Sequence, residues 1–138
     1  MQEISQQLQQ VLLRMAQACQ QVARNLDDVQ LLAVSKMQDA SKVRAVYLAG
    51  QHHFGENYVQ EALAKMEQLQ DLAITWHLIG ALQSNKTAEV AENFAWVHSV
   101  DRLKIAQRLS KQRPKHLPAL NICLQVNIDD QESKSGCP

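Results

Sequence analysis

Short apolar runs alternate with amphipathic segments along the chain, and this alternation restricts the possible folds more than any other feature. Strict alternation with short connections predicts parallel βα units joined by right-handed crossovers. The expected strands cover residues 31–36, 53–57, 76–80, 96–100 and 121–128. The expected helices cover 3–24, 58–70 and about 84–92, with one from Asp39 to Gly50 and one capped by Asp101.

The expected strands end in polar residues or glycine, a pattern typical of a (β/α) barrel. In such a barrel the C-terminal ends of the strands share one mouth, where binding sites form. These end residues are Lys36, Asn57, Gly80, Ser99 or Asp101, and Asn127 or Asp129. No G-x-G-x-x-G or P-loop motif supports a nucleotide-binding fold. We therefore predict an α/β fold, a partial TIM (β/α) barrel of about five parallel βα units, as a single domain over residues 1–138.

Lys36 ends the first of these runs, LLAVSK at 31–36. Four apolar residues in succession indicate a strand buried on both faces, as in parallel sheets. A lysine at the end of such a strand, partly screened from water, loses its proton more easily and can form a Schiff base with a carbonyl compound. A solvated lysine leaving a strand is the plainer alternative, and this run alone favours it.

The balance of charges argues against a nucleic-acid-binding protein. Lysine and arginine together number 14, as do aspartate and glutamate, so the formal net charge is zero. Hydrophobic residues make up 46% of the chain, enough for a folded core. No run approaches the roughly 18 apolar residues of a membrane span, and residues 1–10 lack the features of a signal peptide.

The cysteines and histidines give no metal-binding pattern. Cys19, Cys123 and Cys137 have no paired spacing, so we expect free thiols in a reducing cytoplasm. His52 and His53 are adjacent, and on a strand they would point to opposite faces. We therefore expect no metal site.

Several motifs occur together in a characteristic order. They are LLAVSK, FGENYVQEA at 54–62, WHLIGALQSNK at 76–86, SVDR at 99–102, and QVNI at 125–128 with SKSG at 133–136. Together they closely resemble the pyridoxal phosphate homeostasis protein family, small cytoplasmic proteins related to the N-terminal barrel of alanine racemase. The resemblance implies a cytoplasmic protein of vitamin B6 homeostasis that holds pyridoxal 5′-phosphate (PLP) as a Schiff base on Lys36. It also implies a cofactor contact from Asn57 near the ring.

Other candidate residues have weaker support. His77, Ser99 and Asn127 could line the same mouth, but structural roles are favoured for all three. Glu56 and Glu61 lie five positions apart across a strand-to-helix junction and have no evident reason to converge, so we expect Glu61 to be a surface charge of a helix. The family often carries an SKTK-like turn after the first strand. Here the turn is SKMQ at 35–38, which removes one positive charge near the site.

The chain is short for a closed barrel, which usually takes eight strands and about 250 residues. An arc of five strands leaves unpaired backbone groups at both edges and an apolar inner face in water. We expect a truncated product of poor stability, a half-barrel completed by self-association, or part of a longer chain. The loops that usually hold the cofactor phosphate follow strands 7 and 8, so we expect a weaker hold on PLP.

Three functional hypotheses follow. The first is a carrier that buffers PLP and exchanges it with PLP-dependent apo-enzymes, with no catalytic residue of its own. The second is a PLP-dependent enzyme such as an amino-acid racemase, which needs a second acid–base group. Neither Tyr47, expected within a helix, nor Tyr58, expected at a helix start, is an evident candidate. The third is an inactive fragment that offers at most an interaction surface.

Overall fold

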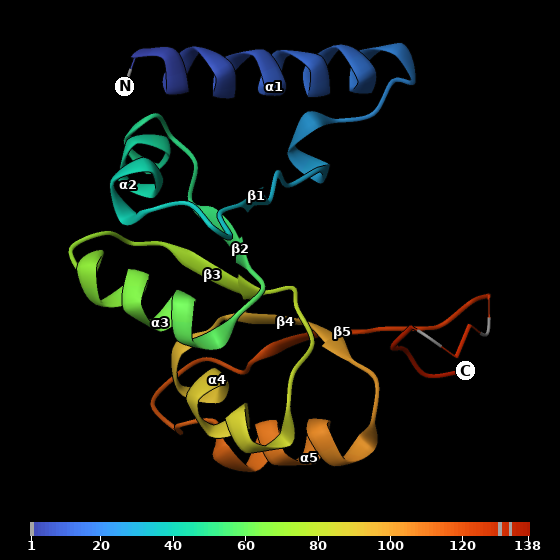
Figure 1. The fold of residues 1–138 in the computed structure, drawn as a ribbon. Coiled ribbons are helices and arrows are strands. Elements are labelled where there is room, and N and C mark those ends of the chain that lie inside the picture. The colour runs from blue at the N-terminus through green and yellow to red at the C-terminus, as the bar shows by residue number, and fades with distance from the viewer. Residues whose placement is uncertain (1, 130, 133) are drawn as a thin grey trace.

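The computed structural model describes residues 2–129, 131–132 and 134–138, so Ser133 of the SKSG motif lies outside the described residues. Within these residues, five strands form one parallel sheet in the order β1-β2-β3-β4-β5 (Figure 1). The strands are β1 (Ala33–Val34), β2 (His53–Glu56), β3 (Thr75–Leu78), β4 (Trp96–Val100) and β5 (Asn121–Leu124). The helices are α1 (Gln2–Gln21), α2 (Ala40–Leu48), α3 (Val59–Gln68), α4 (Thr87–Asn93) and α5 (Leu103–Gln112), with 3-10 turns η1 (Leu26–Asp28) and η2 (Ser84–Lys86). The predicted α/β class and parallel βα units are confirmed.

The hydrophobic core lies between one face of the sheet and helices α2 to α5. The parallel register places Phe54 beside Trp76 and Leu78 beside Val97, so these side chains share the core face. They pack with buried helix residues such as Val43, Ala62, Val90 and Ile105. Alternation along the strands sends His53, His77, Trp96 and His98 to the opposite face, which we call the histidine face.

The expectation that strand 31–36 is buried on both faces is wrong. β1 contains only Ala33–Val34, and Val34 is 52% exposed. In the described part of the chain, β1 is an edge strand that pairs with β2 alone. Side chains alternate between the two faces of a strand, and Val34 pairs with Gly55, so its side chain lies on the face opposite the core.

The last strand is also shorter than predicted, because the chain changes partner at Gln125, whose carbonyl accepts from the Cys137 N–H at 2.9 Å. Gln125 donates its N–H to the carbonyl of Val100 at 2.8 Å, but Asn127 donates to the carbonyl of Cys137 at 2.8 Å. Val126 and Cys137 therefore form an isolated parallel bridge outside the sheet.

The ends of the helices follow the sequence signals in α2 but not in α5. The Asp39 carboxylate caps α2 as predicted, and Gly50, with φ +112°, follows the end of that helix. The prediction that Asp101 caps α5 is wrong, because Arg102 is the N-cap residue and makes no side-chain capping bond. The Asp101 carboxylate instead accepts a hydrogen bond from the Gly136 N–H at 3.2 Å.

The apolar stripe of α1 is only partly used. Within α1, Leu8 and Cys19 are buried, but Val11 is 41% exposed. The helix lies beside α2, away from most of the sheet (Figure 1). Leu48 of α2 and Leu103 of α5 are each 73% exposed. Helical spacing identifies an apolar stripe, but it does not say which edge of the stripe meets the core.

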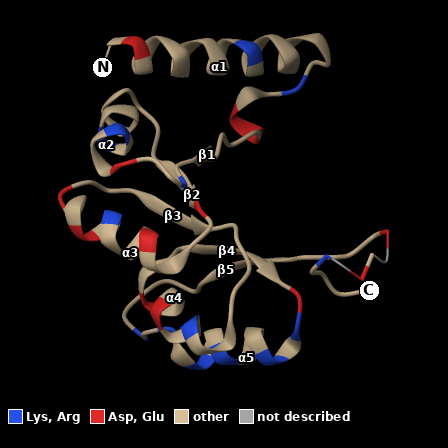
Figure 2. Ribbon diagram, in the orientation of Figure 1, with Lys and Arg blue, Asp and Glu red and all other residues tan. Residues whose placement is uncertain are grey.

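Charged side chains are unevenly distributed although the formal net charge is zero. Figure 2 shows basic residues along α5 and acidic residues on η1. Among the described helices, none has the length and apolar character needed to cross a membrane.

Candidate functional site

Lys36 lies two residues after the end of β1, at the C-terminal end of the sheet, and it is exposed. Within the described residues, no carboxylate lies within ion-pair distance of its amine. These residues therefore do not supply the partial screening from water that we expected. They leave the amine accessible to a carbonyl compound.

The residues around Lys36 form a tight turn. The Gln38 N–H donates to the Ser35 carbonyl at 3.1 Å, which places Lys36 and Met37 at the two central positions. Met37 has a φ of +64°, the sign that a type II turn requires at its third residue. Residues other than glycine seldom adopt this conformation, so the turn needs support from outside.

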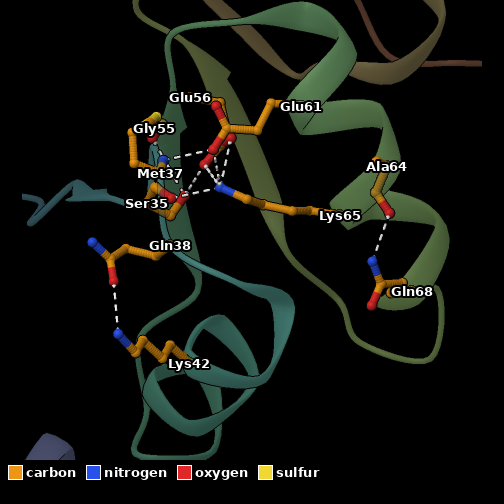
Figure 3. A network of polar contacts seen from close by, with 10 residues as sticks. All are labelled: Ser35, Met37, Gln38, Lys42, Gly55, Glu56, Glu61, Ala64, Lys65 and Gln68. Atoms are coloured by element: carbon orange, nitrogen blue, oxygen red, sulfur yellow. Dashed lines mark hydrogen bonds and ion pairs between the residues drawn. The ribbon is translucent and has the colours of Figure 1, made fainter.

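That support comes from a buried group of polar side chains, the Lys65 network, which consists of Ser35, Glu56, Glu61 and Lys65 (Figure 3). The Lys65 Nζ lies 3.0 Å from each Glu56 carboxylate oxygen and 2.9 Å from Glu61 Oε1. It also donates to the Ser35 carbonyl at 2.6 Å. The Ser35 hydroxyl donates to Glu56 Oε2. Lys65 is 5% exposed and Glu56 is fully buried, so the pair is shielded from water.

The expectation that Glu56 and Glu61 do not converge is wrong. Glu56 ends β2 and Glu61 lies in the first turn of α3, and both contact Lys65 one helical turn further on. The hydrogen bond from Lys65 lowers the pKa of the Glu61 carboxyl, against the smaller raising effect of burial. Sequence reasoning missed Lys65, although its i,i+4 spacing from Glu61 is a recognisable signal of a helical ion pair.

Asn57 follows β2 at the same end of the sheet as Lys36. Its Oδ1 atom is buried without a hydrogen-bond partner among the described residues. Asn57 is packed against Gly80, where an added Cβ would lie 2.1 Å from the Asn57 carbonyl oxygen. The two residues line a hollow of about 490 Å³ together with Tyr58, Gln83 and Lys86.

A second hollow, of about 450 Å³, lies near the C-terminal ends of β3 and β5. Asn127 lines it together with Ile79, Gln125, Lys134 and Ser135. Asn127 also donates its side-chain amide to the Gln131 carbonyl at 2.7 Å, so it organises its own loop. The Ser99 hydroxyl is buried without a partner among the residues that the structure describes.

His77 occupies the centre of a chain of three histidines on the histidine face. Its Nε2 lies 2.9 Å from His53 Nδ1, and its Nδ1 lies 2.9 Å from His98 Nε2. Its ring stacks on Trp96 with centroids 5.5 Å apart. Burial, followed by the neighbouring His98 and His53, lowers the pKa of His77 to about 4, so the ring is neutral at pH 7. No metal-binding group of three or more His, Cys, Asp or Glu side chains occurs among the described residues.

Two described residues have the chemistry for a cofactor that carries an aldehyde, although Lys36 is not among the residues that line the hollow beside Asn57. Lys36 supplies an accessible amine, and the Asn57 Oδ1 is buried without a partner among the described residues, so a bound ligand could provide one. Fold and site together define a partial parallel (β/α) barrel with an exposed lysine at the end of its first strand.

Comparison with known proteins gives the family. The family model for the alanine racemase N-terminal domain matches residues 11–138, and the chain belongs to this family. Curated relatives include the pyridoxal phosphate homeostasis protein of Pseudomonas aeruginosa, 56% identical over 137 residues, and that of Escherichia coli, 48% identical over 139 residues. Each alignment covers 99% of this chain but only 60% and 59% of the relative, so the chain spans about three-fifths of their length. The resemblance to pyridoxal phosphate homeostasis proteins is thereby confirmed.

Solved structures agree with this assignment. PipY of Synechococcus elongatus, solved with PLP bound, is 42% identical with a TM-score of 0.75, over 90% of this chain and 57% of that one. A protein of unknown function from Bifidobacterium adolescentis is 35% identical with a TM-score of 0.88, over 99% of this chain and 60% of that one. The partial-barrel prediction is confirmed by these matches.

Proposed function

We propose that this chain binds PLP through Lys36 and serves in the homeostasis of this cofactor. The observation that carries the proposal is the exposed Lys36, which forms no ion pair within the described residues, two positions after β1 in a chain similar to a protein solved with PLP bound. The names of the curated relatives support the homeostasis role.

The chemistry is a reversible condensation. Bound PLP would supply an aldehyde, and the neutral amine of Lys36 would hold it by a condensation that releases one water, with hydrolysis returning the free amine and the free aldehyde. Because the reaction is reversible, the same site can take up PLP and release it to PLP-dependent apo-enzymes of the cytoplasm. Asn57 is the proposed second contact to the cofactor, through its buried Oδ1, which has no hydrogen-bond partner among the described residues.

A binding role is favoured over racemase chemistry because, among the described residues, no hydrogen bond joins either tyrosine to Lys36. The Tyr47 hydroxyl accepts a hydrogen bond from the Ala73 N–H at 3.2 Å, and its ring stacks on His52. Tyr58 is 61% exposed at the start of α3.

Self-association is also part of the proposal. The edge strands of the described sheet, β1 and β5, present exposed apolar side chains, with Val34 at 52% and Leu124 at 69% exposure. Exposed edges with apolar residues favour pairing with another chain. Sedimentation of the 138-residue chain tests this, and a monomer at all concentrations would contradict it.

The test of PLP binding is a titration followed by chemical trapping. Wild-type chain mixed with PLP should develop the visible absorbance of a Schiff base, and borohydride reduction followed by peptide mapping should place the adduct on Lys36. Lys36→Ala should lose both signals. Lys42→Ala is a matched control, because Lys42 is another exposed lysine in the neighbouring helix α2. A wild-type chain without the band, or a trapped adduct spread evenly over other lysines, would refute the proposal.

A further inference from the structure

Helix α3 holds both peptide groups that flank the Cα atom of Lys36. The peptide before Lys36 is held by its carbonyl, that of Ser35, which accepts from Lys65 Nζ at 2.6 Å. The peptide after Lys36 is held by its N–H, that of Met37, which donates to Glu61 Oε1 at 2.5 Å. The orientations of these two peptide planes set the φ and ψ angles of Lys36. Two side chains of one helix therefore fix the backbone conformation of Lys36 and with it the direction of its Cα–Cβ bond.

The holding side chains are themselves fixed. A lysine ammonium has three N–H donors, and Lys65 has three acceptor groups around it, namely the Ser35 carbonyl and the carboxylates of Glu56 and Glu61. Glu56 is fully buried and also accepts from the Ser35 hydroxyl, so it cannot turn to water. A long, flexible side chain is in this way restricted to one arrangement (Figure 3).

We propose that Lys65 is a positioning residue for Lys36. Together with Glu56 and Glu61, it holds the turn at residues 35–38 in the single conformation that presents the Lys36 amine to a carbonyl ligand. This inference rests on the proposed function, because positioning has a purpose only if the amine reacts.

The conformation of Met37 shows why the turn needs to be held. A non-glycine residue at φ +64° is unfavourable on its own, so the turn would relax if its partners were removed. The Glu61 carboxylate on the Met37 N–H opposes that relaxation. Without it, Lys36 regains backbone freedom, and we expect its equilibrium constant for adduct formation with PLP to fall about tenfold, the factor associated with ordering one residue.

Glu61 gives the cleanest variant, because its side chain is 26% exposed and its removal leaves the buried Lys65–Glu56 pair intact. Glu61→Ala removes the acceptor for the Met37 N–H. Glu61→Gln keeps a carbonyl oxygen that can accept the same hydrogen bond, so it should restore most of the reactivity.

Asp71→Ala is the matched control for stability. Asp71 pairs with Arg44 of α2 at 2.7 Å, just beyond the end of α3. Its loss should weaken the contact between α2 and the end of α3 without touching the turn that contains Lys36. A purely structural role of Glu61 predicts that Glu61→Ala and Asp71→Ala react with PLP alike.

Two readouts are compared at conditions where far-UV circular dichroism shows each variant folded. The first is the equilibrium constant for adduct formation at Lys36 with PLP. The second, which needs no cofactor, is the hydrogen-exchange rate of the Met37 amide by NMR. In Glu61→Ala we expect the equilibrium constant for adduct formation to fall about tenfold and the Met37 amide to exchange at least about tenfold faster. In Asp71→Ala we expect both quantities to stay at their wild-type values.

The outcomes separate the two proposals. Wild-type reactivity in Glu61→Ala, or an equal loss in Asp71→Ala, overturns the positioning role. A wild-type chain that forms no adduct refutes the proposed function, and the restraint of the turn by Glu61 is then judged from the Met37 amide alone. An unchanged hydrogen-exchange rate of this amide in Glu61→Ala overturns the restraint, and a faster rate supports it.

Lys65 itself is tested with a double variant, Lys65→Met with Glu56→Gln, which avoids leaving a buried carboxylate unpaired. We expect a loss of adduct formation at least as large as in Glu61→Ala. Wild-type adduct formation by this folded double variant would refute a role for Lys65. If the double variant does not fold, the result of Glu61→Ala decides.

Discussion

Lowering the pH from 7 to 5 is expected to destabilise the folded chain through His77. His77 is 6% exposed, its two ring nitrogens each lie 2.9 Å from a ring nitrogen of His53 or His98, and its ring stacks on Trp96. Burial lowers its pKa from 6.5 to about 4. Between these two values the unfolded chain binds a proton that the folded chain excludes.

The sign and size of the effect follow from this difference. The stabilisation is present above pH 6.5 and is lost as the pH falls towards 4. For pKa values of 6.5 and about 4, the free energy of unfolding should decrease by about 2 kcal/mol between pH 7 and pH 5. Burial also lowers the pKa of His53 and of His98, so both add to the loss. Carboxyl groups with ordinary pKa values near 4 contribute little in this interval.

Urea unfolding monitored by tryptophan fluorescence at pH 7, 6 and 5 measures the effect directly. His77→Gln should be less stable at pH 7 but should lose most of the pH dependence. His116→Gln is the control, because His116 is exposed in the loop before β5 and should keep the wild-type slope. A change of less than about 0.5 kcal/mol in the wild-type chain, or an undiminished slope in His77→Gln, would refute the reasoning.

Three further predictions concern stability. Gly80→Ala should lower the free energy of unfolding by about 3 kcal/mol, because the new Cβ would lie 2.1 Å from the Asn57 carbonyl oxygen; wild-type stability in urea would contradict this. Asp39→Ala should cost about 1 kcal/mol through loss of the cap on the Lys42 N–H, and Asp39→Ser should restore it in the same assay. Phe54→Ala should cost about 3 to 5 kcal/mol, because Phe54 is 1% exposed in the core; a thermal melt within a few degrees of wild type would show that the cavity has collapsed.

Much of the fold could be predicted because its signals are local. The apolar run at 96–100 coincides with β4, and Asp39 and Gly50 mark the two ends of α2. The prediction that strand 31–36 is buried on both faces was wrong. Burial of the second face of β1, which carries Val34, depends on what covers that face and not on the apolar run itself. The stripe on α1 shows the same limit, since its apolar spacing is real and yet Val11 remains exposed.

The candidate site was predicted only in part. Lys36 and Asn57 could be identified as residues at strand ends, and their roles in PLP binding remain predictions. Lys65 was missed and Glu61 was assigned to the surface, because the contacts that bury Lys65 join α3 to β2 and to the turn at residues 35–38, in one case across 30 residues of sequence.

The sequence alone determined the alternation of strands and helices, the parallel order of the sheet and the lysine at the end of β1, because periodicity and end residues express local geometry. Only the tertiary structure decided that Glu56, Glu61 and Lys65 meet beside the turn that contains Lys36, and that His53, His77 and His98 lie together on the other face. Both groups depend on the register between neighbouring strands and on how α3 lies against them. These are collective results of packing that no short stretch of sequence encodes.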